Sequence, residues 1–156
     1  QILTVIVSVV FDLNQFASDV LLFTPSEFNL MKLPESLCTG SSVMPQKKNY
    51  DVLELLRAKY SIILGEEMKV KNLIGNLMSG YNRDVQLSKE PVMKGLDIGL
   101  ECVQIATLVV SELQIDTSAC EAAISEQMHA TAEAYKLVKE GMPFRDAYKQ
   151  VATKYR

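Results

Sequence analysis

Apolar residues recur at helical spacing over the first part of the chain. They fall three or four positions apart, at Val5, Val9, Leu13, Phe16 and Val20. The β-branched cluster from Thr4 to Val10 has strand propensity, but an apolar run to Phe23 without a turn signal favours one buried helix. Asp12 interrupts the run too early for a membrane span, which needs about 20 apolar residues. A signal peptide would require a basic residue ahead of the apolar run, and none is present there. We therefore expect a core helix already under way where the chain starts, as in a piece of a longer protein.

Two further long helices are predicted after Pro45. The first carries apolar residues at helical spacing up to a break at Ser79 and Gly80, namely Val52, Leu56, Tyr60, Ile63, Met68, Leu73 and Leu77. The second begins at Glu90, with Pro91 in its first turn, where the missing N–H costs nothing. Its apolar stripe has spacings of four and three, at Val92, Leu96, Leu100, Val103, Thr107 and Val110. Segments 24–39 and 81–89 lack a sustained period and are predicted to be connections.

Shorter helices are predicted after residue 115. Asp116 can cap a helix through Ser125, a further helix from Ala130 to Glu140 ends at Gly141, and Pro143 opens a last one through Tyr155. The sequence therefore predicts an all-α protein, with a bundle of long helices in residues 1–115 and a small helical portion in residues 116–156. Apolar stripes on three long helices exceed what a small monomer can cover, so we expect self-association.

Composition and charge narrow the class of protein. The chain is 48% hydrophobic and 22% charged, which is typical of a soluble globular domain. Its formal net charge of -3 indicates no basic surface for nucleic acid. Cys38, Cys102 and Cys120 lie far apart and His129 is the single histidine, so neither a metal centre nor a disulfide framework is expected. We expect no cofactor and a location in the reducing cytoplasm.

One short stretch concentrates groups that can do chemistry. Residues 40–49 read GSSVMPQKKN, which places two hydroxyls, two lysines and an amide in a loop before a helix. A Gly-Ser-Ser loop by itself is as often a plain flexible connector. The full string matches the pattern GSSxMPxKxN, and in this the chain resembles the fumarase and aspartase superfamily of lyases. Its MPQKKN portion, together with a second block that reads YNRDVQLSKEP from Tyr81, resembles the argininosuccinate lyase branch.

The resemblance implies an architecture. Subunits of the superfamily have three mostly helical regions, and the long central helices of four subunits form the core of a homotetramer. Residues 1–115 resemble the later part of the central region, with the signature loop at 36–48, and residues 116–156 resemble the start of the C-terminal region. The family's catalytic histidine belongs to an amino-terminal region that this chain does not match. His129 lies in the wrong context to replace it, so we expect the chain alone to be inactive.

The resemblance also implies a reaction, the reversible anti elimination of argininosuccinate to arginine and fumarate. Ser41 would be the general base that removes the proton beside a carboxylate, and backbone amides with the charge of Lys47 would favour its alkoxide. Glu54 matches the family acid that orients the absent histidine. The remaining candidates would bind the substrate: Ser42, Asn49, Tyr81, Gln86 and Lys89.

Several alternatives stay open at this point. An acid such as Glu54 is favoured in the first turn of any helix, because it interacts well with the helix dipole. Lys48 is interpreted as a surface charge. Tyr50 stands where a proline is common in the family, which could alter how the following helix starts. Adenylosuccinate lyase and aspartase are alternative activities. A non-enzymatic, crystallin-like role ranks below them because the motif residues are intact.

Overall fold

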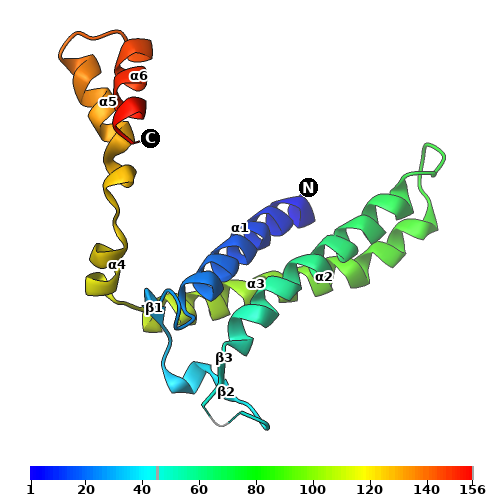
Figure 1. The fold of residues 1–156 in the computed structure, drawn as a ribbon. Helices are drawn as coiled ribbons and strands as arrows, with labels where there is room; N and C mark the ends of the chain where they lie inside the picture. The colour runs from blue at the N-terminus through cyan, green and yellow to red at the C-terminus, as the bar shows by residue number, and fades with distance from the viewer. Residues whose placement is uncertain (45, 156) are drawn as a thin grey trace. The chain divides into compact units, whose positions relative to one another are not determined.

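The computed structural model describes residues 1–44 and 46–155, and these form two compact units that join between Ile115 and Asp116. The first unit is built on three long helices, α1 (Ile2–Phe23), α2 (Asp51–Ile74) and α3 (Lys89–Glu112), each of which contacts the other two (Figure 1). Their buried side chains form one core, whose largest fully buried members are Val10, Val20, Leu53, Ile63, Cys102 and Val109. The predicted all-α class is confirmed.

Short pieces connect the long helices. β1 (Met31–Lys32) pairs antiparallel with β4 (Gln114–Ile115), and β2 (Thr39–Gly40) pairs antiparallel with β3 (Lys48–Asn49). Two 3-10 helices complete the unit, η1 (Glu35–Leu37) and η2 (Arg83–Ser88). The strands were not predicted, because two residues are too few to show an alternating pattern.

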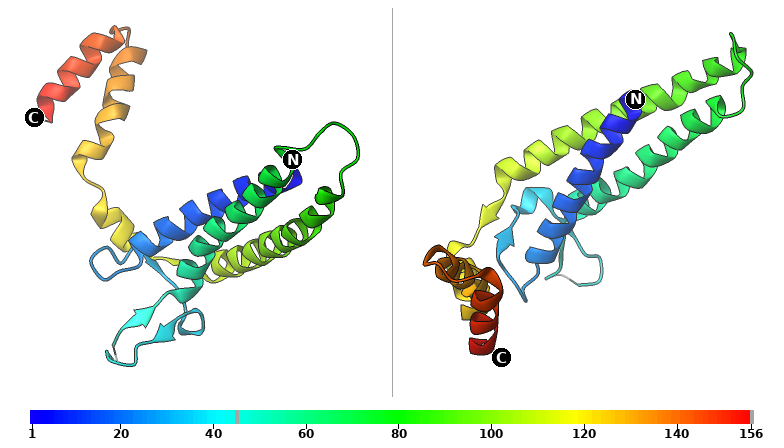
Figure 2. Two further views of the ribbon diagram at one scale, coloured as in Figure 1. Left: turned by 90° about the vertical axis from the view of Figure 1, so that its right-hand side faces the viewer. Right: turned by 90° about the horizontal axis from the view of Figure 1, so that it is seen from above.

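The second unit begins with α4 (Thr117–Ala123) and η3 (Glu126–His129). Asp116 accepts a hydrogen bond from the Ala119 amide, which confirms the predicted cap, although α4 ends two residues before Ser125. A helical hairpin follows, α5 (Ala130–Lys139) and α6 (Phe144–Lys154), whose helices lie side by side in Figure 2. It is closed by Glu133, which accepts hydrogen bonds from Lys154 and Tyr155.

The apolar stripe predicted on α3 lies mostly outside the core of the single chain. Most of its apolar members are exposed, and Leu100 and Val110 are each 60% accessible. The buried face of α3 carries mostly smaller residues, namely Pro91, Gly95, Ile98, Gly99, Cys102, Ala106 and Val109. On α1 the same holds only near its start, where Val5 and Val9 are exposed while Leu3, Val7 and Val10 are buried. Periodicity identified the helices, but not which of two apolar faces packs inside the chain.

The small residues of α3 allow α1 to approach closely. A Cβ atom added to Gly95 would overlap Leu3, and one added to Gly99 would overlap the γ-methyl group of Ile6. The Ile6 methyl lies on a branched side chain with a stiff χ1 angle, so it cannot move aside easily. By length and composition α1 is the one described helix that could cross a membrane, and its buried residues pack in the core with α2 and α3.

Two adjacent carboxylates are buried in the middle of α2. Glu66 forms ion pairs with Lys94 of α3 at 2.7 Å and with Lys69 at 2.9 Å. Glu67 forms an ion pair with Lys71 at 2.8 Å and accepts a hydrogen bond from Thr4 of α1. These hydrogen bonds to cations and hydroxyl hold the pKa of both carboxyls below the ordinary value. One pair of neighbouring residues thus fixes α2 against both partner helices.

Substituting Gly99 by alanine is expected to destabilise the chain. The overlap with Ile6 costs about 1–3 kcal/mol, which exceeds the roughly 1 kcal/mol that alanine gains in a helix. Gly65 of α2 is the matched control, because nothing lies within 4 Å of its added Cβ. Gly65→Ala should therefore raise the free energy of unfolding, measured by urea denaturation, while Gly99→Ala lowers it. Equal stabilisation by both variants would contradict the close approach of α1 to α3.

Stability is expected to fall in acid through Glu66 and Glu67. Their folded pKa values lie below the ordinary 4.5, so the stability that they contribute is complete above that pH and is lost as the pH falls through the folded values. The double variant Glu66→Gln/Glu67→Gln should be less stable near neutral pH and should lose stability less steeply between about pH 6 and pH 3. Urea midpoints across that range provide the measurement. Parallel pH profiles for the two proteins would show that these carboxylates carry no linkage.

Candidate functional site

The signature segment forms the tip of a β-hairpin. β2 and β3 pair Thr39 with Asn49 and Gly40 with Lys48, so residues 41–47 make the connecting loop. The signature residue Pro45 lies outside the described residues. Val43 is 83% exposed and its neighbours Ser42, Gln46 and Lys47 are also exposed. The loop therefore projects from its hairpin with little packing of its own.

The hydroxyl of Ser41 lies among backbone amides. Its Oγ accepts hydrogen bonds from the amides of Val43 at 3.2 Å and Met44 at 3.0 Å. Donors aimed at an oxygen favour negative charge on it, which is what a serine needs to act as a base. Ser41 is half-buried, whereas Ser42 beside it is exposed.

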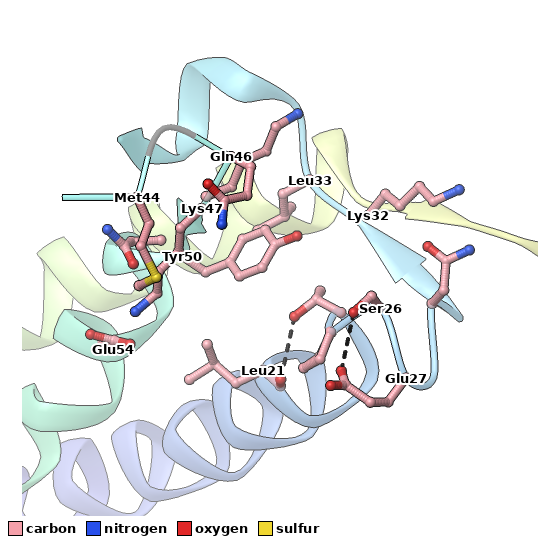
Figure 3. A pocket seen from close by; sticks show the side chains of 15 residues that line it. Leu21, Ser26, Glu27, Lys32, Leu33, Met44, Gln46, Lys47, Tyr50 and Glu54 are labelled. Carbon is pink, nitrogen blue, oxygen red and sulfur yellow. Dashed lines mark hydrogen bonds between the residues drawn. The ribbon is translucent and has the colours of Figure 1, made fainter. Parts of the chain in front are cut away.

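A pocket of about 930 Å³ adjoins the hairpin. Figure 3 shows Met44, Gln46 and Lys47 on one side of it and Ser26 and Glu27, from the turn after α1, on the other. Further candidates from the sequence, Asn49 and Glu54, also line it. Ser41 and Ser42 are not among the lining residues. The structure therefore gathers Lys47, Asn49 and Glu54 around one cavity, with the two serines on the loop beside it.

The individual groups around this pocket have different partners. The Asn49 side-chain amide donates to the Gly40 carbonyl at 3.4 Å, across the base of the hairpin. Glu54 is exposed in the first turn of α2. Lys48 forms an exposed ion pair with Glu35, in which Nζ lies 2.7 Å from Oε1. That contact raises the pKa of Lys48 and lowers the pKa of Glu35.

The second block lies at the other end of α2. Tyr81 is 86% exposed, Gln86 donates its amide to the Tyr81 hydroxyl at 3.4 Å, and Lys89 is exposed at the start of α3. α2 has 24 residues, and a helix of that length extends about 36 Å. The hairpin and the second block stand at opposite ends of the α2 and α3 pair in Figures 1 and 2. A single chain thus does not bring Tyr81, Gln86 and Lys89 to the signature loop.

Sequence reasoning missed the wall of the pocket that faces the loop. Ser26, Glu27, Asn29 and Lys32 come from a connection that was predicted only as a loop. Asn29 has a φ of 49°, a left-handed conformation that asparagine tolerates better than most residues. The isolated Asn in a Pro-containing connection was a turn signal, but nothing in its spacing indicated which surface the turn would reach.

Comparison with known proteins finds similar chains among lyases. A family model described as lyase matches residues 1–65. The argininosuccinate lyase of Thermotoga neapolitana is 42% identical over 99% of this chain, and that of Sorangium cellulosum is 43% identical over 89% of it. The first 65 residues of the chain therefore match a lyase family, and nearly the whole chain is similar to argininosuccinate lyases. It is a relative of the argininosuccinate lyases, so the resemblance drawn from the two sequence blocks is confirmed.

Solved structures of lyases share the fold. EDDS lyase in complex with formate matches 96% of this chain with a TM-score of 0.80 at 22% identity, and the chain covers 30% of that structure. A fumarate lyase:delta crystallin from Brucella melitensis in native form matches 97% with a TM-score of 0.64 at 19% identity, and 34% of that structure is covered. The chain also spans only 39% of the Thermotoga neapolitana relative and 32% of the Sorangium cellulosum relative.

Proposed function

We propose that this chain supplies part of the active site of an argininosuccinate lyase, a carbon–nitrogen lyase that interconverts argininosuccinate with arginine and fumarate. The observation that carries the proposal is the signature loop, in which two backbone amides donate to the Ser41 hydroxyl beside a cavity lined by Lys47, Asn49 and Glu54. About 40% identity to argininosuccinate lyases over most of the chain supports this activity above the other lyases of the superfamily.

The proposed chemistry begins at Ser41. Its oxygen takes the proton from the carbon beside a substrate carboxylate, and the electron pair left on that carbon forms the double bond of fumarate as the carbon–nitrogen bond breaks. The departing guanidinium nitrogen takes up a proton and leaves as part of arginine. Negative charge builds on the carboxylate during proton removal, so a nearby cation lowers the barrier. Lys47 is the candidate for that cation, and Ser42 and Asn49 are candidates for holding the substrate.

A complete site in this proposal requires more than one subunit. Tyr81, Gln86 and Lys89 lie a helix length away from Ser41 in the same chain, so they would serve the signature loop of another copy. The exposed apolar residues of α1 and α3 support such an assembly, because faces with Val5, Leu100 and Val110 accessible to water favour association. We propose a homotetramer in the cytoplasm, as the resemblance implies, with no nucleic acid or membrane partner.

Replacing the proposed base provides a direct test. In the intact enzyme Ser41→Ala should lower kcat by the roughly 10²–10⁴-fold typical of a lost general base, with KM changed by only a few-fold. Ser125→Ala, at an exposed serine before η3 that makes no side-chain cap hydrogen bond, is the control and should leave kcat unchanged. Turnover is followed by fumarate formation from argininosuccinate, and adenylosuccinate and aspartate are assayed in parallel. A kcat for Ser41→Ala within a few-fold of the parent would exclude Ser41 as the base.

The isolated chain is expected to be inactive even when folded. It carries the signature loop and the second block but no group assigned to protonate the leaving nitrogen, and catalytic groups that act as a unit fail together. Mixing and refolding it with a full-length enzyme whose signature serine is replaced by alanine should restore some activity, because hybrid assemblies can combine an intact loop with the missing groups. Steady fumarate release by the purified 156-residue chain alone would contradict this account.

A further inference from the structure

The signature hairpin has very little backbone pairing. β2 and β3 meet at two residue pairs, and a hairpin this short is marginally stable by itself. The loop beyond these pairs is mostly exposed, so packing does not fix it. The placement of Ser41 relative to Lys47 and Asn49 therefore depends on what holds the base of the hairpin.

Besides the Asn49 contact within the hairpin, two side-chain contacts tie that base to the rest of the unit, one from each strand. Thr39 of β2 donates its hydroxyl to the carboxylate of Asp51, the first residue of α2, at 2.5 Å. Lys48 of β3 forms the 2.7 Å ion pair with Glu35 of η1. None of these four residues is among the proposed catalytic or substrate-binding groups. Each contact links a strand of the hairpin to a different part of the surrounding unit.

The two acidic partners stand on well-anchored segments. η1 is preceded by Leu33, which is 7% exposed, and Leu37 and Cys38 pack against the core. Asp51 is followed by Val52, which packs against the core, and by the fully buried Leu53. Glu35 and Asp51 thus connect a weakly paired hairpin to parts of the chain that the core holds in place.

We infer that Glu35 and Asp51 are positioning residues, which set the orientation of the hairpin and so the placement of Ser41, Lys47 and Asn49. The consequence for catalysis rests on the proposed function. Exposed ion pairs contribute little to overall stability, whereas a small displacement of a catalytic group lowers the rate strongly. Losing either contact should therefore lower kcat clearly and change the melting temperature only a little.

Charge exchange tests the ion pair. In the intact enzyme, Glu35→Lys and Lys48→Glu should each lower kcat by roughly 3- to 30-fold while KM stays within about two-fold. The double variant Glu35→Lys/Lys48→Glu rebuilds the pair with opposite polarity and should recover most of the loss. If Glu35→Lys does not fold, Glu35→Gln removes the charge without reversing it and should show the same fall in kcat.

Asp51 is tested by a conservative pair of variants. Asp51→Ala removes the acceptor for the Thr39 hydroxyl and should lower kcat, while Asp51→Asn keeps an oxygen acceptor and should recover activity. The matched control is the exposed ion pair between Glu133 and Lys154, which joins α5 to α6 with a distance of 2.8 Å. The charge exchange Glu133→Lys/Lys154→Glu should leave kcat unchanged.

Amide hydrogen exchange in residues 40–49 gives a readout that does not need activity. Exchange should be faster in Glu35→Lys, Lys48→Glu and Asp51→Ala, and it should return toward the parent rate in the charge-exchanged double variant. Unchanged exchange with unchanged kcat in these variants, or a loss of melting temperature alone, would overturn the inference. An intact protein without lyase activity, in which exchange still responds as described, would reject the proposed function and retain the positioning role.

Discussion

The distance between α1 and α3 is set by the two glycines that α3 presents to α1. Because Gly95 and Gly99 lack side chains, Leu3 and Ile6 fill the space that their Cβ atoms would occupy. The end of α1 then determines where the chain turns at residues 24–29, and this turn forms one wall of the pocket beside the signature loop. The pairing of β1 with β4 joins the strand after this turn to the chain that follows α3. The geometry of the site thus depends on a contact between helices that contains no functional group.

The buried face of α3 shows how a sequence can specify helices without specifying their neighbours. Leu96 and Leu100 belong to a regular apolar stripe, yet Gly99 and Ala106 face the core beside Ile98 and Val109. Both faces are compatible with helical periodicity, and the choice between them is made by the shape of α1 and α2, which periodicity does not describe. The predicted boundaries were nevertheless close, as at Phe23 and Asp116, because caps and breaks depend on residues near in sequence.

The residues of the candidate site likewise divide into those that the sequence indicated and those that it could not indicate. The GSSVMPQKKN string indicated its loop because the motif is local, and the loop does carry amides to the Ser41 hydroxyl. The hairpin that carries the loop could not be predicted, since its ladder depends on Thr39 and Asn49 meeting across it. The turn residues Ser26 and Glu27 were missed because their approach to the pocket follows from helix packing. The separation of the second block from Ser41 also became visible only once α2 was seen to run between them.

The adjacent carboxylates of α2 have a consequence for how the chain can vary in evolution. Glu66 is bound from α3 and Glu67 from α1, so a slip of α2 by one turn would move both groups about 5.4 Å from their partners. α2 therefore behaves as a spacer of fixed length, with the signature hairpin at one end and the Tyr81 block at the other. A change in the length of α2 would alter the separation of the hairpin from the Tyr81 block, and with it the composite site proposed for an assembly.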